Sequence, residues 1–170
     1  MEPAVLSHSE HAPQSSVSSE CLQFLTFICA REIYAIDTLC VREIIEYGQV
    51  TSLPLMPDFI RGVINLRGSV VPVIDLQARF SKGTTRQSSR TCIVILELMQ
   101  DGEPHVLGIV VDSVSEVIEI EMAEVKAAPA IGNRIREDFI RGMVKVRDTF
   151  LTVLQIDQVL SVSEIAGRLH

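Results

Sequence analysis

The chain contains an internal repeat, which constrains its fold more than any other feature of the sequence. The segment 58–67, DFIRGVINLR, matches the segment 138–147, DFIRGMVKVR, at six of ten positions. A shorter repeat lies upstream, where 41–46, VREIIE, corresponds to 114–119, VSEVIE. The two halves of the chain are therefore related, and the fold is expected to contain each repeated unit twice.

Short apolar runs separated by turn residues predict about ten strands. Val contributes 20 and Ile 18 of the 170 residues, and such β-branched side chains favour strands over helices. The run Val106–Val111 is apolar throughout, as is typical of a central strand covered on both faces. Asp101-Gly102 is a typical hairpin turn, because Asp and Gly both tolerate a positive φ, and Arg67-Gly68 is a weaker signal of a second one. The expected strands are 24–28, 34–39, 41–45, 63–66, 70–76, 92–99, 106–111, 114–120, 143–146 and 150–156.

Each half is too small for a sandwich, but five short strands can roll into an SH3-like barrel. We therefore expect a mainly β fold, in which two such barrels pack side by side about a pseudo-two-fold axis, with short helical turns. A groove between the two modules is the first place to look for a binding partner. Residues 1–20 are rich in Ser and Pro and are expected to form a flexible tail, 21–160 the folded domain, and 161–170 a short C-terminal helix or tail, with Ser163 as the N-cap of a helix over 163–169.

Charge and motif content argue against several classes of function. The net charge is −7, which disfavours binding to nucleic acid. No stretch is long and apolar enough to span a membrane, and no leader peptide is expected. Phosphate-binding and zinc-hydrolase motifs are absent from the sequence, so we expect no catalytic residues, no metal and no cofactor. A thiol-dependent or metal enzyme using Cys92 or His105 is the competing hypothesis. The spacing of Cys21, Cys29, Cys40 and Cys92 instead indicates reduced thiols.

The repeat also raises questions about individual residues. Gly62 and Gly142 follow Arg at equivalent positions, which indicates little room for a Cβ atom or a positive φ. Arg61 is expected to form a surface ion pair, with a contact across an interface as the alternative. Asp148 replaces Gly68 in the second half, so only the first hairpin is expected to keep its turn. Arg67 is expected to lie at the tip of that hairpin, where it can meet carboxylates or carbonyls of a partner.

The segment 59–76, FIRGVINLRGSVVPVIDL, resembles the CheW family of chemotaxis coupling proteins, in which N-L-R-G is followed by V-P-[IV]-[IV]-D-L. Supporting segments are YAID at 34–37 and GIVVD at 108–112, so the resemblance covers roughly residues 22–160. It implies a fold of two five-stranded SH3-like barrels and no catalytic activity.

The resemblance also implies partners and a location. Members of the family are adaptors that join the cytoplasmic tips of chemoreceptors, the methyl-accepting chemotaxis proteins, to the regulatory domain of the histidine kinase CheA. The chain is therefore expected in the cytoplasm, at membrane-associated receptor arrays. The alternative is an adaptor of a non-flagellar chemosensory pathway, such as one controlling twitching motility.

Carried over by motif, the resemblance implies a receptor-binding groove and a kinase-binding segment. For Val41, Val114 and Val117, a place in the core remains an equal expectation, since alternate residues of a strand face inward. Cys92 stands where the family is expected to have Val, which makes the groove slightly smaller and chemically reactive. The groove is expected to contain Val41, Glu43 and Ile44 from the first barrel, Asn65, Leu66 and Arg67 at the hairpin, and Cys92, Val114 and Val117 from the second barrel, with Lys126 and Ile131 contacting the kinase.

Overall fold

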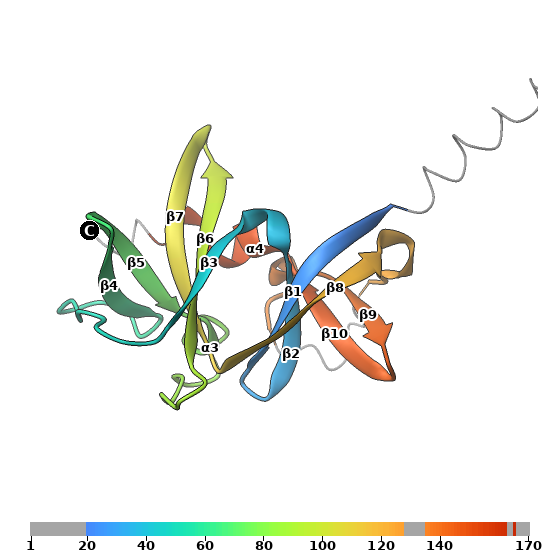
Figure 1. Cartoon of the computed structure of the whole chain (residues 1–170), viewed down its shortest axis with the longest axis horizontal. Coiled ribbons are helices and arrows are strands. Elements are labelled where there is room, and N and C mark those ends of the chain that lie inside the picture. The colour runs from blue at the N-terminus through green and yellow to red at the C-terminus, as the bar shows by residue number, and fades with distance from the viewer. Residues whose placement is uncertain (1–19, 128–134, 163–164, 166–170) are drawn as a thin grey trace, which may run out of the picture.

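The computed structural model describes residues 20–127, 135–162 and 165, which form two five-stranded sheets lying side by side (Figure 1). The fold prediction of a mainly β chain with two related five-stranded units of the SH3-like kind is confirmed. In chain order the elements are β1 (Cys21–Cys29), β2 (Glu32–Asp37), η1 (Thr38–Cys40), β3 (Val41–Glu46), β4 (Ile60–Leu66), β5 (Ser69–Asp75), α3 (Leu76–Arg79), β6 (Cys92–Gln100), β7 (Glu103–Val111), β8 (Ser113–Glu121), η2 (Met122–Glu124), η3 (Glu137–Phe139), β9 (Ile140–Val146), β10 (Thr149–Leu154) and α4 (Ile156–Val159).

The two sheets have the same topology. One has the strand order β8-β1-β2-β10-β9 and the other β3-β6-β7-β5-β4. Each contains one parallel pair, β10 with β2 and β5 with β7, among antiparallel neighbours. The repeated segments 58–67 and 138–147 supply β4 and β9 at equivalent edges, and the shorter repeat supplies β3 and β8 at the other edges. The hairpin of β1 and β2 therefore completes the sheet whose other three strands come from the end of the chain (Figure 1).

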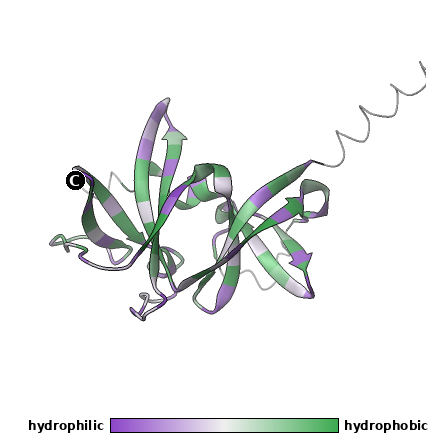
Figure 2. Cartoon of the chain, viewed as in Figure 1, coloured by the Kyte–Doolittle hydropathy of each residue, from purple (hydrophilic) through white to green (hydrophobic). Residues whose placement is uncertain are grey.

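Three apolar clusters hold the sheets together. One lies within each sheet, and the largest lies between them and takes side chains from both. In β6, Ile93 and Ile95 pack within their own sheet, whereas Val94 and Leu96 face the shared cluster. This arrangement explains why the central strands are apolar at successive positions. Figure 2 shows hydrophobic residues along the strands and hydrophilic residues gathered at turns and loops.

Gly62 and Gly142 allow the preceding segment to approach each edge strand closely. A Cβ atom at Gly62 would lie 2.0 Å from the carbonyl oxygen of Thr51, and one at Gly142 would lie 2.4 Å from Val125. At both places the approaching segment exchanges two backbone hydrogen bonds with the residue after the glycine, Thr51 with Val63 and Lys126 with Met143. The expected lack of room for a Cβ atom is confirmed at both copies of the repeat.

The expectation of a surface ion pair at Arg61 is wrong. Its guanidinium lies 3.3 Å from the fully buried carboxylate of Asp75 and donates to the Thr85 carbonyl oxygen at 2.6 Å. Asp75 also caps α3 by accepting from the backbone of Gln77 and Ala78, and it accepts from both the backbone and the hydroxyl of Thr85. A buried carboxylate needs such partners. Arg61 therefore pairs with a group in the protein interior and is not available for a contact across an interface.

Two expectations fall outside the described residues. These are the flexible tail, apart from Glu20, and the C-terminal helix over 163–169, of which only Ile165 is described. The predicted short helical turns are present as α3 and α4. Across the described ranges, no helix has the length and apolar character needed to cross a membrane.

Candidate functional site

Strand β3 presents its candidate residues on two different sides. Its exposure alternates along the strand, so that Glu43 is partly buried and Ile44 is 42% exposed. Strand β8 repeats the arrangement in part, because Val117 is 54% exposed. Successive residues of a strand point to opposite faces. Ile44 and Val117 are therefore available as apolar contacts, whereas Glu43 faces the hairpin side of its sheet.

The β4–β5 hairpin carries Asn65, Leu66 and Arg67. Arg67 and Gly68 form the turn with φ values of 50° and 89°, so the predicted turn is confirmed. The side-chain oxygen of Asn65 accepts from the backbone N–H of Gly68 at 2.9 Å. Asn65 therefore supports the turn, and Leu66 is partly buried against the cluster within its sheet. The Arg67 side chain takes no part in either role and is 70% exposed.

Replacing Asn65 with alanine is expected to lower the free energy of unfolding by about 1 kcal/mol, because the Gly68 N–H loses its partner and the turn its support. Urea unfolding of both proteins measures this difference. Lys145→Ala provides the matched control, since it occupies the equivalent position of the β9–β10 hairpin. An Asn65→Ala variant as stable as the wild type would show that the turn does not depend on this hydrogen bond.

Arg67 forms a two-pronged ion pair with Glu43. Nη1 and Nη2 of the guanidinium donate to the Glu43 carboxylate, and the Arg67 side chain remains 70% exposed. The hydrogen bond from Arg67 is the main cause that lowers the pKa of Glu43 below its ordinary value, and the same pairing raises the pKa of Arg67. The pair joins β3 to the hairpin tip and orients an exposed guanidinium. The two predicted groove residues are thus brought into direct contact.

Removing the guanidinium with Arg67→Ala is expected to raise the pKa of Glu43 back toward the ordinary glutamate value, because the hydrogen bond from Arg67 is the main cause of its lowering. The ion pair favours the carboxylate, so its contribution to stability is present above that ordinary value. The contribution is lost as the pH falls through the lowered pKa of the folded protein. An NMR titration of the Glu43 side-chain carbon measures both values. An unchanged midpoint in Arg67→Ala would contradict the assigned cause.

The repeat reproduces this ion pair on the other sheet. Arg147 lies 3.2 Å from the Glu116 carboxylate, and both residues occupy the repeat positions of Arg67 and Glu43. The expectation that the second hairpin loses its turn is wrong. Arg147 and Asp148 have φ values of 50° and 64°, the same left-handed conformation as Arg67 and Gly68. Aspartate tolerates this conformation better than most residues. The two halves therefore share a hairpin with a paired arginine.

Cys92 lies in a different sheet from the one expected. It begins β6 and pairs with Glu46 of β3, so it belongs with Val41, Glu43 and Ile44, and not with Val114 and Val117. It still lies near the junction, because its sulfur approaches the backbone of Val114.

The structure also corrects the expected reactivity of Cys92. Burial raises the pKa of the Cys92 thiol, and the contact with Val114 offsets this only in part. Burial likewise raises the pKa of Cys40 to about 11. Since the thiolate is the reactive form, Cys92 is less reactive than an ordinary thiol, which also weakens the hypothesis of a thiol enzyme. Among the described residues, no group of three or more potential metal ligands comes together.

The remaining candidates divide between the core and the second sheet. Val41 and Val114 are partly buried against the shared cluster, so both contribute to packing between the sheets. The backbone of Lys126 pairs with Met143 of β9, and its ammonium donates to the Ala123 carbonyl oxygen at 3.3 Å. Ile131 lies outside the described residues. The two residues chosen for kinase contact therefore belong to the connection that leads into the β9 edge.

Sequence reasoning missed two exposed apolar residues near the hairpin turns. Val70 is 69% exposed after the first turn, and Phe150 is 63% exposed at the equivalent position after the second. The two residues are equivalent in the repeat, and each begins an expected strand, 70–76 or 150–156. Membership of an apolar strand predicts burial, so their exposure was not predicted. Their exposure is set by how the hairpins pack in the folded chain, which the local apolar pattern does not encode.

Comparison with known proteins shows extensive similarity. Residues 23–164 match the family model described as "CheW-like domain". The chain is 36% identical to "Chemotaxis protein CheW" of Klebsiella aerogenes over 144 residues, which is 85% of this chain and 84% of that protein. It is 30% identical to "Protein FrzA" of Myxococcus xanthus over 132 residues, covering 76% of this chain and 80% of that protein. The crystal structure of the scaffolding protein TtCheW from Thermoanaerobacter tengcongensis superposes with a TM-score of 0.74 and 32% identity, covering 83% of this chain and 88% of that one.

Proposed function

The chain belongs to the CheW-like family, and from this we propose that it is a non-enzymatic adaptor that couples chemoreceptors to the histidine kinase CheA. The observation that carries this proposal is the exposed Arg67 guanidinium at the N-L-R-G hairpin, held by Glu43. Orientation by an ion pair reduces the side-chain entropy that is lost when the guanidinium binds a partner. Such a group is suited to recognising carboxylates or carbonyls bidentately.

The receptor surface combines this polar contact with apolar ones. Ile44 and Val117 are exposed on the strands that form corresponding edges of the two sheets. Apolar residues of this kind can receive the apolar face of a helix, and a charged pair at the edge adds specificity more than affinity. We place the helical tip of a receptor on this surface. The contact set is Val41, Glu43, Ile44, Asn65, Leu66, Arg67, Cys92, Val114 and Val117, with Val41, Asn65 and Val114 supporting its shape.

The kinase contact is proposed at the connection between β8 and β9. Lys126 leads into the edge strand β9, and Ile131 follows in the same connection. This connection belongs to the sheet that does not carry the Arg67 hairpin. The receptor surface draws on this sheet only through Val114 and Val117 of β8, and the kinase contact uses the separate connection to β9, so one molecule can hold a receptor and a kinase at the same time. The adaptor would act in the cytoplasm, at membrane-associated receptor arrays, and would transform no substrate.

Separate binding measurements test the two halves of this proposal. The full chain is titrated with a soluble receptor tip fragment and, in a second experiment, with the regulatory domain of CheA. We expect saturable binding in both. Lys126→Glu is expected to weaken kinase binding and to leave receptor binding unchanged, whereas Ile44→Glu is expected to do the reverse. A protein that binds neither fragment would overturn the proposal.

The second candidate is an adaptor of a non-flagellar chemosensory pathway, such as one controlling twitching motility. The observation in its favour is the similarity to "Protein FrzA", a relative that is not named as a chemotaxis protein. Both candidates use the same fold and the same kind of surface. Deletion of the coding sequence distinguishes them, because loss of directed swimming supports the first candidate and loss of twitching with normal swimming supports the second.

A further inference from the structure

The junction of the two sheets contains a polar cavity that the adaptor role does not use. Its volume is about 830 Å³, which falls within the range of small-molecule sites. Figure 1 shows the β1–β2 turn and α3 close together at the lower edge of this junction. The two walls come from different sheets, and the chemistry of the cavity comes from Arg31, Glu32, Lys82, Thr84, Arg86 and Asp112.

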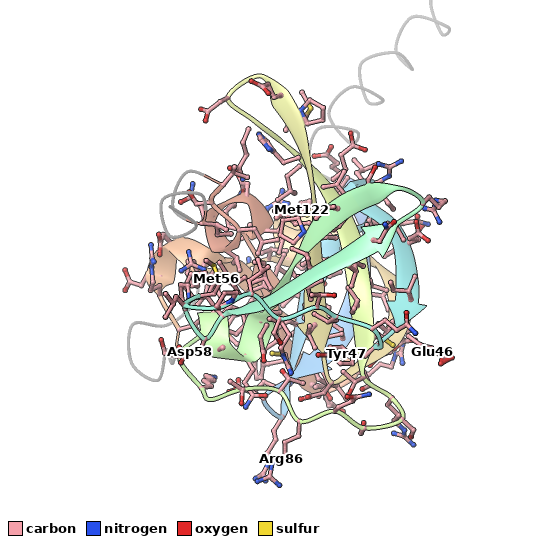
Figure 3. The ribbon with its side chains drawn as sticks, turned by 90° about the vertical axis from the view of Figure 1, so that its left-hand side faces the viewer. Glu46, Tyr47, Met56, Asp58, Arg86 and Met122 are labelled. Atoms are coloured by element: carbon pink, nitrogen blue, oxygen red, sulfur yellow. The ribbon has the colours of Figure 1, made fainter. Side chains whose placement is uncertain are left out.

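The cavity lining is rich in basic side chains, although the chain as a whole is acidic. The net charge of the protein is −7, yet the loop 81–90, SKGTTRQSSR, carries Lys82, Arg86 and Arg90 and no acidic residue. The ammonium of Lys82 pairs with Glu32 at 3.1 Å. Within the part of the chain that the structure describes, the guanidinium groups of Arg31 and Arg86 have no ion-pair partner. Figure 3 shows Arg86 projecting from its loop at the lower edge of the molecule, away from the protein body, so its guanidinium is open to solvent at the rim of the cavity.

The loop wall of the cavity is preorganised by buried contacts. Gln77 of α3 and Lys82 exchange hydrogen bonds, one from the Lys82 backbone N–H and one from the Gln77 side-chain amide. Thr85, between Thr84 and Arg86, is bound twice to the buried carboxylate of Asp75. The backbone that carries two of the three cations is therefore held in place before any ligand arrives. Such preorganisation lowers the entropy cost of binding.

The opposite wall is a strained turn. Ala30 and Arg31 have φ values of 52° and 69°, the left-handed conformation that L residues rarely adopt. The turn is held by a hydrogen bond from the Ala30 N–H to the Asp112 carboxylate at 3.1 Å. A glycine or asparagine would relieve this strain. The hairpin turns at Arg67–Gly68 and Arg147–Asp148 have the same conformation, so it belongs to the two-residue turn itself, and here that turn places Arg31 in the cavity lining.

From this arrangement we infer that the cavity binds a small phosphorylated sugar, either as a nucleotide or as a sugar phosphate. Arg31 and Arg86 line the cavity from opposite walls as exposed side chains, unpaired among the described residues, that can turn toward a ligand, and guanidinium groups bind phosphate bidentately. The carboxylates of Glu32 and Asp112 are acceptors for sugar hydroxyls, as acidic residues are in other nucleotide sites. A simple anion would use only the cations. The cavity therefore combines arginines that lack an ion-pair partner in the described part of the chain with carboxylates that can accept further hydrogen bonds. This combination favours a ligand with a phosphate at one end and hydroxyl donors at the other.

Isothermal titration calorimetry with the full chain tests this inference. The probes are ATP, glucose 6-phosphate, inorganic phosphate and adenosine. We expect ATP or glucose 6-phosphate to bind at least about ten-fold more tightly than inorganic phosphate or adenosine, since each of these lacks half of the recognised groups. Tighter binding of ATP identifies a nucleotide site, and tighter binding of glucose 6-phosphate identifies a sugar-phosphate site.

Two variants connect any binding to this cavity. The double variant Arg31→Ala/Arg86→Ala is expected to bind the preferred probe at least about ten-fold more weakly. Arg90→Ala, in the same loop but outside the cavity lining, is expected to bind as the wild type does. Melting temperatures of both variants verify that they fold. No binding of any probe, equal binding of inorganic phosphate, or full binding by the double variant would each overturn the inference.

Discussion

Gly62→Ala is expected to lower the free energy of unfolding by about 4 kcal/mol or more, which is a large part of the about 5–15 kcal/mol that keeps a domain folded. The added Cβ atom would lie 2.0 Å from the Thr51 carbonyl oxygen, and φ at this position is +149°. Both backbone hydrogen bonds between Thr51 and Val63 would have to break for the chain to accommodate it. Yield of soluble protein and thermal unfolding measure the effect.

Gly48→Ala is the matched control, because a Cβ atom there would meet nothing within 4 Å. It is expected to leave the melting temperature unchanged or slightly higher. Gly142→Ala should be destabilising but milder than Gly62→Ala. Its nearest obstacle is the side chain of Val125, at 2.4 Å, although the Lys126 carbonyl oxygen lies at 2.8 Å. A Gly62→Ala protein with wild-type stability would show that the edge contact is dispensable.

Arg67→Glu is expected to weaken association with a receptor tip by about 100-fold, equivalent to about 2.7 kcal/mol. The substitution removes the exposed guanidinium and places a second carboxylate beside Glu43. Folding is expected to persist, because the side chain is at a hairpin tip and is 70% exposed. A binding titration and a melting curve on the same sample separate these two effects.

Arg147→Glu is the control for this experiment. It makes the same change at the equivalent turn of the other sheet, where Arg147 pairs with Glu116. We expect it to retain receptor binding, because the proposed surface does not include that hairpin. A large fall in melting temperature for Arg67→Glu would show that Arg67 is structural. Equal losses of binding in both variants would show that the effect comes from net charge alone.

The repeat made much of the fold predictable. Two copies of one strand pattern require two related units, and the equivalent positions of β4 and β9 follow from this. Residues whose role is local were also predicted well, since Arg67 and Gly68 form their turn from their own backbone preferences. The glycines at positions 62 and 142 were also predicted well, because a neighbouring backbone segment approaches each of them and both copies of the repeat therefore keep glycine.

Features that depend on distant parts of the chain were not predictable. Cys92 was assigned to the wrong sheet because strand order is set by packing between segments, and the sequence shows only their succession. Arg61 was expected at the surface, but its partner is the buried Asp75, fourteen positions away on the neighbouring strand. The contact between Glu43 and Arg67 likewise joins β3 to the hairpin at the opposite edge of the same sheet.

Simultaneous binding of a receptor and a kinase by one molecule is the central claim. Its direct test is sedimentation of receptor-containing membranes mixed with CheA, with and without this protein. We expect CheA in the pellet only when the protein is present, with the amount falling again when a large excess of the protein separates the two partners onto different molecules. Equal amounts of CheA in the pellet with and without the protein would contradict the claim.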